Sequence, residues 1–75
     1  MSFDFELALN LVKQRKRVAR EGWNGKGMYI EMQVPDEHSK MQKPYLYICC
    51  VDGQFVPWVA SQTDILANDW TEVTE

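Results

Sequence analysis

The sequence predicts a single α+β domain, residues 1–75, in which an N-terminal helix packs on a small antiparallel β-sheet. Three observations predict it: apolar residues at helical spacing over residues 3–15, alternating residues over 28–34 and 45–58, and the hairpin-turn pair Asp52-Gly53. A chain of 75 residues buries only a small core, and its two cysteines are too few for a disulfide framework. We therefore expect the protein to be oligomeric.

The first predicted helix begins after Asp4, whose side chain can cap it, and ends at the basic residues that follow Val12. Phe5, Ala8, Leu9 and Val12 stand at positions i, i+3, i+4 and i+7, which places them on one face of a helix. We expect this face to cover one side of the sheet.

A basic segment follows the helix, since six of the eight Lys and Arg residues lie between Lys13 and Lys26. Two interpretations fit it. The segment is a charged edge strand that resists aggregation, or it contacts phosphate groups, with Arg20 beside Trp23 as the best candidate. Asn24-Gly25 is a strong turn signal, so Trp23 is expected at the lip of a loop.

Three strands are predicted in the middle of the chain. Residues 28–34 alternate between two faces, and residues 45–51 are apolar on both faces. Residues 54–58 return after the Asp52-Gly53 turn, with Pro57 at a sheet edge, and residues 35–44 form a polar loop. Because one helix covers only one face of this sheet, a partner subunit is the economical cover for the other.

A short helical turn is predicted near the C-terminus. Ser61 is followed three residues later by Asp64 and then by an apolar run, which is typical of a helix start, while Asn68-Asp69 should stop the helix. A last short strand is expected over residues 70–73. The side chains expected to gather at the helix start are those of Trp58, Ser61, Gln62, Thr63 and Asp64.

This gathering has two interpretations. A helix start offers free backbone N–H groups and a positive dipole end, and beside a flat indole it can hold a base or a phosphorylated small molecule. The alternative is that Trp58 and Trp70 belong to the core and that Ser61 and Asp64 only cap the helix.

Composition excludes several classes of protein. A net charge of −3 argues against a polymer nucleic-acid ligand, and no segment approaches the length of a membrane span. The N-terminus has no basic-then-apolar signal peptide. Cys49 and Cys50 would point to opposite faces of a strand and could not easily bridge, so we expect reduced cysteines and a cytoplasmic location.

The sequence offers little support for catalysis. His38 is the sole histidine and has no Cys or acidic neighbour at metal-ligand spacing, and the glycines match no phosphate-binding fingerprint. Asp64 and Asp69 could form a carboxylate pair, but their spacing does not demand one. We expect no metal, no cofactor and no enzymatic activity. Aromatic surface with amide, hydroxyl and a few basic groups is typical of a nucleotide-binding module.

Two blocks of sequence carry a resemblance to a known family. Residues 18–26, centred on Gly22-Trp23-Asn24-Gly25, and residues 57–70 resemble the second type of Thoeris anti-defence proteins, a small family of phages and prophages. Residues 5–9 and the hairpin at 47–54 match as well, so the resemblance covers most of the chain. The loop at 35–44 is shorter than in many relatives.

The resemblance implies a homotetramer of α+β protomers that binds, without degrading it, the cyclic ADP-ribose isomer made by bacterial TIR-domain defence proteins. The Thoeris effector in the host cytoplasm would then never be activated. Some members resemble binders of cyclic dinucleotides. Carried onto this sequence, Trp23 and Trp58 would enclose the ligand. Base and ribose would be read by Asn24, Gln62, Thr63 and Asp64 in the turn that begins at Ser61, and the phosphates would face Arg20 and Lys26.

Two rival functions stay open at the level of sequence. The protein could hydrolyse a nucleotide, in which case captured ligand would return as products. It could also be a protein-interaction module that uses the second face of the sheet, in which case a host protein would co-purify with it.

Overall fold

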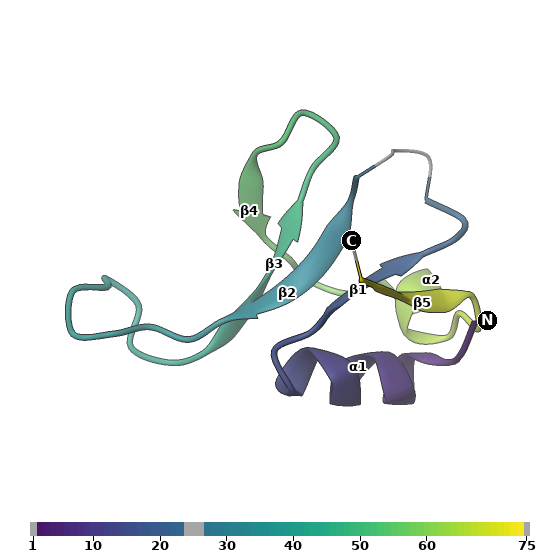
Figure 1. The fold of residues 1–75 in the computed structure, drawn as a ribbon, viewed down its shortest axis with the longest axis horizontal. Helices are drawn as coiled ribbons and strands as arrows, with labels where there is room; N and C mark the ends of the chain where they lie inside the picture. The colour runs from purple at the N-terminus through teal and green to yellow at the C-terminus, as the bar shows by residue number, and fades with distance from the viewer. Residues whose placement is uncertain (1, 24–26, 75) are drawn as a thin grey trace.

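The computed structural model describes residues 2–23 and 27–74, and these form a helix-and-sheet structure that confirms the predicted α+β protomer (Figure 1). The strands build one antiparallel sheet in the order β4-β3-β2-β1-β5. The elements in chain order are α1 (Phe5–Lys13), β1 (Arg17–Arg20), β2 (Tyr29–Gln33), β3 (Tyr45–Cys49), β4 (Phe55–Pro57), α2 (Gln62–Ile65) and β5 (Trp70–Val73).

Helix α1 forms where its capping and apolar residues predict it. The Asp4 carboxylate accepts a hydrogen bond from the Leu7 backbone N–H, with 3.1 Å between N and Oδ1. Ala8 and Val12 are buried against the sheet. Leu9, predicted on the same stripe, is only half-buried, and it is Leu11, also half-buried, that packs against the core.

Strand β1 lies inside the sheet, between β2 and β5. The interpretation of this basic segment as a charged edge strand is therefore wrong. β1 is not an edge strand because it also pairs with β5, which lies far along the chain. This pairing runs from Arg17 opposite Val73 to Arg20 opposite Trp70. A strand rich in arginine is accommodated at this central place because its arginines find carboxylate partners on both faces of the sheet.

Trp70 is the centre of the core. Its side chain is fully buried, and its ring centroid lies 5.4 Å from Phe5, 5.4 Å from Trp23 and 6.2 Å from Trp58. Its indole N–H donates to the backbone carbonyl of Asp64 at 3.0 Å. The interpretation of Trp70 as a core residue is therefore confirmed, and this one side chain joins α1, α2 and the turn after β1.

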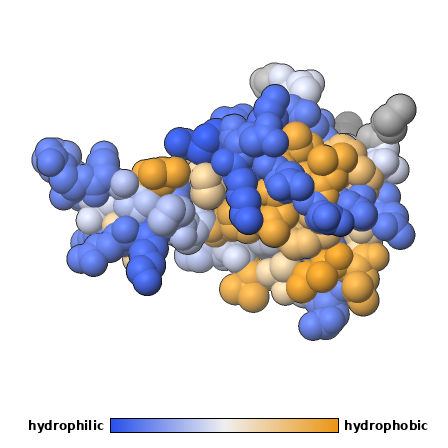
Figure 2. Space-filling model, turned by 90° about the horizontal axis from the view of Figure 1, so that it is seen from below, coloured by the Kyte–Doolittle hydropathy of each residue, from blue (hydrophilic) through white to orange (hydrophobic). Residues whose placement is uncertain are grey.

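The predicted hairpin and loop are also present. Gly53 has a φ of +84°, and its backbone N–H donates to the Cys50 carbonyl at 2.9 Å, which closes the turn between β3 and β4. Pro57 lies on β4, which is an edge strand as predicted. Residues 34–44 form a projecting loop whose surface is mostly hydrophilic, at the left of Figure 2.

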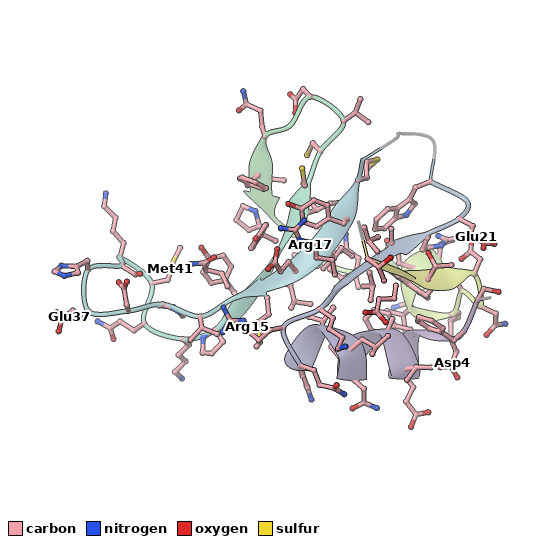
Figure 3. The ribbon with its side chains drawn as sticks, viewed as in Figure 1. Asp4, Arg15, Arg17, Glu21, Glu37 and Met41 are labelled. Atoms are coloured by element: carbon pink, nitrogen blue, oxygen red, sulfur yellow. The ribbon has the colours of Figure 1, made fainter. Side chains whose placement is uncertain are left out.

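The sheet has one face covered by helices and one face without a helix. Val18, Ile30 and Ile48 point to the helix side, where all three are buried. We call the other face the open face and define it by Arg17, Tyr29, Glu31, Tyr45, Tyr47 and Phe55. Figure 3 shows Arg17 on the side of the sheet away from α1. This arrangement matches the prediction that a single helix covers only one face.

Candidate functional site

The candidate site starts at the end of β1, where Arg20 meets two aspartates from the C-terminal part of the chain. Its Nη1 lies 2.8 Å from Asp64 Oδ1 and its Nε lies 2.8 Å from Asp69 Oδ1. Its Nη2 is 3.5 Å from Asp69 Oδ2. The Arg20 side chain is only 17% exposed, so these ion pairs are partly shielded from water.

The turn after β1 carries Trp23 over this ion-pair cluster. The Trp23 backbone N–H donates to the Arg20 carbonyl at 3.3 Å, and the Gly22 N–H donates to Asp69 Oδ2 at 2.9 Å. The indole N–H of Trp23 points toward Asp64 Oδ1 at 3.5 Å, a long hydrogen bond. The ring packs edge-on against Trp70 and is half-buried, which leaves part of its surface open to a ligand.

Helix α2 begins as the sequence predicts. Ser61 is its N-cap, and the Ser61 Oγ accepts a hydrogen bond from the Asp64 backbone N–H at 3.1 Å. Gln62 and Thr63 occupy the first turn and are exposed, while Asp64 turns toward Arg20. The exposed amide and hydroxyl side chains are thus available to a polar ligand, whereas the carboxylate of Asp64 already has protein partners.

Trp58 lies at another edge of Trp70. Its ring is half-buried, 6.2 Å from Trp70 and 6.3 Å from Phe5, and its backbone N–H donates to the Leu46 carbonyl at 3.0 Å. Trp23 and Trp58 therefore both pack against the same buried ring while keeping part of their own surface exposed. The prediction that they enclose a ligand stays a prediction.

The ion pairs shift the pKa values of the three charged groups. The hydrogen bonds from Arg20 are the main reason that the pKa of Asp69 is lowered, and the two carboxylates in turn raise the pKa of Arg20. Burial pushes the pKa of Asp64 up, but hydrogen bonds with Arg20, Ser61 and Trp23 outweigh burial and lower it. Both aspartates are therefore ionised at neutral pH.

The structure brings Arg20, Trp23 and Asp64 together, as the sequence analysis proposed for one site. It adds Asp69, which sequence reasoning considered as a helix stop and as a carboxylate partner of Asp64 but not as a partner of Arg20. The predicted contact between Arg20 and a phosphate stays untested, and carboxylate oxygens occupy that guanidinium. Asn24 and Lys26 lie outside the described residues, so their predicted contacts stay predictions.

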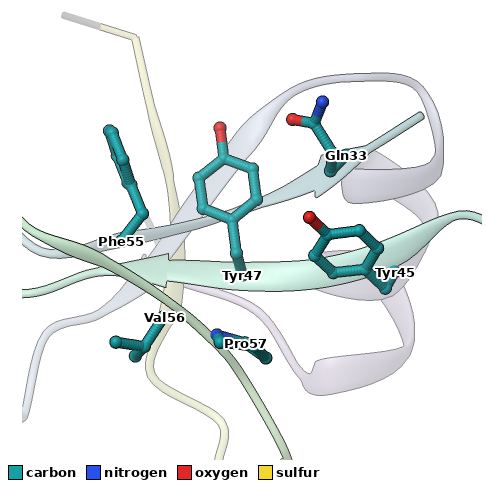
Figure 4. Close-up of a pocket in the computed structure, with 6 residues that line it drawn as sticks. All are labelled: Gln33, Tyr45, Tyr47, Phe55, Val56 and Pro57. Atoms are coloured by element: carbon teal, nitrogen blue, oxygen red, sulfur yellow. The ribbon is translucent and has the colours of Figure 1, made fainter. Parts of the chain in front are cut away.

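A second candidate is a groove on the open face, a face that sequence reasoning expected to meet a protein partner without predicting a groove (Figure 4). Its volume is about 310 Å³. Tyr47 forms its floor, packs edge-on against Phe55 at 5.2 Å and donates its hydroxyl to Glu31 Oε1 at 2.9 Å. The lining residues are Gln33, Tyr45, Tyr47, Phe55, Val56 and Pro57. The alternation of tyrosines along residues 45–49 was the signal that could have indicated it.

A charged cluster borders this groove. The Arg17 guanidinium stacks over the Tyr29 ring at 4.4 Å, and its Nε lies 3.1 Å from Glu31 Oε1. Burial, together with the hydrogen bond to Glu31, raises the pKa of Tyr47 to about 12. The open face thus combines aromatic rings with one ion pair.

Two further properties concern the described residues only. Residues 2–23 and 27–74 contain no group of three or more His, Cys, Asp or Glu side chains that could hold a metal ion. No helix within those ranges is both long enough and apolar enough to cross a membrane.

Comparison with known proteins gives the family. The sequence model of the Thoeris anti-defense 2-like domain matches residues 3–73, which is nearly the whole chain. The protein named Thoeris anti-defense 2 of Bacillus phage SP01 is 34% identical over an alignment 83 residues long, with 93% of each chain covered. Both sequence blocks that carried the resemblance, and the elements α1 to β5, lie within the matched residues. The chain belongs to the Thoeris anti-defense 2-like family.

Proposed function

We propose that this protein is a phage anti-defence protein that binds and sequesters a cyclic ADP-ribose-type signalling nucleotide in the host cytoplasm. The ligand is held and not degraded, so that the Thoeris effector is not activated. Membership of the anti-defence family supports the role. The observation that carries the nucleotide proposal is a half-buried indole, Trp23, beside an α2 start whose amide and hydroxyl side chains are exposed.

The chemistry of this site suits capture of a nucleotide. A base stacked on one indole face contributes about 1–3 kcal/mol, and two partly exposed indoles are present. Ser61, Gln62 and Thr63 supply hydroxyl and amide groups for ribose and base edges. Lys26, in the same sequence block as Trp23, is our candidate for the phosphates.

The electrostatics of the aspartates support binding without hydrolysis. A general base needs a pKa near the working pH, but the pKa values of Asp64 and Asp69 are lowered. Both carboxylates are hydrogen-bonded to Arg20. They are therefore weak bases, better suited to stabilise the fold or to accept a hydrogen bond from a hydroxyl group than to abstract a proton.

The test is incubation with the cyclic ADP-ribose isomer made by a bacterial TIR-domain protein, followed by heat release of the ligand. Sequestration predicts that ligand disappears from solution and returns chemically intact after the protein is denatured. Recovery of ring-opened products would contradict the proposal and favour a hydrolase. A cyclic dinucleotide run in parallel measures the specificity of capture.

We also propose that the protein assembles as a homotetramer through the open face. Phe55 is 60% exposed and lies beside Tyr47 in the aromatic groove, and exposed apolar surface next to a groove suits contact with another subunit. Light scattering measures the mass directly. A monomer at micromolar concentration would exclude this assembly without affecting the proposal on nucleotide capture.

A further inference from the structure

The Arg20 guanidinium is engaged by carboxylates on the edges that a phosphate would use. Two of its nitrogens are each 2.8 Å from an aspartate oxygen, and one arginine with two aspartates gives the cluster a negative net charge. A phosphate would have to displace Asp69 to pair with the Nε–Nη2 edge, and at any edge it would meet that negative charge. We propose that Arg20 and Asp69 are positioning residues that fix the Gly22-Trp23 turn, so that the Trp23 indole is presented to the nucleotide.

Asp69 ties this turn to the start of β5 by hydrogen bonds to three consecutive residues. Its Oδ1 accepts from Arg20 Nε, its Oδ2 accepts from the Gly22 backbone N–H, and its carbonyl accepts from the Glu21 backbone N–H. The latter two bonds are both 2.9 Å long. Consecutive residues 20–22 are therefore all attached to one aspartate, immediately before Trp23.

Gly22 allows the close approach on which this attachment depends. A Cβ at this position would lie 2.9 Å from Asp69 Oδ2, closer than real Cβ contacts permit. Because the atom in the way is the carboxylate itself, a methyl group would push it off the Gly22 N–H. Glycine is thus required here by the carboxylate.

Arg20 and Asp64 also fix the orientation of Trp23. Its backbone N–H donates to the Arg20 carbonyl, and its indole N–H shares Asp64 Oδ1 with Arg20 Nη1. Arg20 therefore acts on Trp23 both through the turn and through Asp64. For ligand capture the inference rests on the proposed function, but the effect on Trp23 is measurable without any ligand.

The experiment compares Asp69→Asn and Gly22→Ala with the parent and with a matched control, Glu72→Gln. The control also removes one carboxylate of the β5 region, which pairs with Lys16 at 3.8 Å and contacts neither Gly22 nor Arg20. Three tryptophans give three indole N–H resonances in a ¹⁵N-correlated NMR spectrum, which Trp→Phe variants assign. Calorimetric titration with the TIR-derived cyclic ADP-ribose isomer gives the affinity.

We expect both test variants to shift the Trp23 resonance and to weaken binding by about tenfold, part of one stacking contribution. The control should change neither the Trp23 resonance nor the affinity. An unmoved Trp23 resonance in a folded Gly22→Ala variant would overturn the inference, as would an equal loss of affinity in the control. Gly22→Ala changes no charge, so the test still stands if Asp69→Asn fails to fold.

Arg20→Lys separates positioning from direct phosphate contact. If Arg20 positions Trp23, the lysine variant should both shift the Trp23 resonance and weaken binding, because lysine lacks the planar guanidinium that bonds to both aspartates. Weaker binding with an unmoved Trp23 resonance would overturn the inference and assign Arg20 to the phosphate. If the parent itself captures no nucleotide, the proposed function fails, while the resonance in the variants still decides whether Arg20 and Asp69 position Trp23.

Discussion

Replacing Trp70 by phenylalanine tests the core on which both candidate tryptophans pack. The change removes part of a fully buried ring and the indole N–H that donates to the Asp64 carbonyl at 3.0 Å. The lost hydrogen bond costs about 0.5–1.5 kcal/mol. The smaller ring forfeits roughly two or three methylene equivalents at about 0.8 kcal/mol each. The free energy of unfolding should therefore fall by about 2–4 kcal/mol.

That loss is a large share of what a chain of this size possesses. At about 0.05–0.15 kcal/mol per residue, 75 residues are stable by roughly 4–11 kcal/mol. The melting temperature should fall by roughly 10–30 °C, since each kcal/mol corresponds to about 4–8 °C in small domains.

Calorimetry of Trp70→Phe beside Trp58→Phe decides the matter. The two variants delete the same atoms, but Trp58 is only half-buried, so it should lose distinctly less stability. Equal melting temperatures for the two variants would refute the central place that the structure gives to Trp70.

Three further predictions concern the cap, the open face and the site. Asp4→Ala should lower the free energy of unfolding by about 1 kcal/mol, because it removes the helix cap, and should leave ligand affinity unchanged in a titration. Tyr47 should ionise near pH 12 in an ultraviolet absorbance titration. Glu31→Gln should lower this pKa, because a negative hydrogen-bond acceptor no longer opposes ionisation of the phenol; an unchanged titration would show that Glu31 does not contribute to the pKa of Tyr47. Because folding lowers the pKa values of Asp64 and Asp69, their contribution to stability is complete above the ordinary aspartate value of about 4 and is lost as pH falls below it. Denaturant midpoints measured down an acid series should therefore fall less for Asp69→Asn than for the parent.

Local signals were enough to predict most of the elements. The helix at Phe5–Lys13, the Ser61 cap and the Asp52-Gly53 turn each depend on residues a few positions apart, and all three are confirmed. Leu9 shows the limit of this reasoning, because helical spacing alone does not set which way the helix is rotated on the sheet.

Strand order was beyond local reasoning. Six basic residues between Lys13 and Lys26 suggested an edge, because charge on a strand usually meets water. The second neighbour of β1, beside β2, is β5, about fifty residues further along the chain, and nothing within the basic segment specifies that pairing.

The candidate site was predicted as residues but not as an arrangement. Arg20, Trp23 and Asp64 were each selected for their chemistry, yet the ion pairs that join Arg20 to Asp64 and Asp69 span 44 and 49 positions. The groove on the open face likewise depends on the register of β3 with β4, which places Tyr47 beside Phe55. Such juxtapositions arise only once the whole sheet has assembled.

The pairing of β1 with β5 also determines when the protein can fold during its synthesis. A ribosome releases the helix, β1 and the hairpin first, and the residue at the centre of the core, Trp70, emerges only after them. Until then β1 lacks one neighbour, and the isolated bridge between Phe3 and Trp70 that closes the two ends together cannot form. Until then the earlier part of the chain has an unpaired strand edge, a state prone to aggregation, so folding is delayed until β5 has been synthesised.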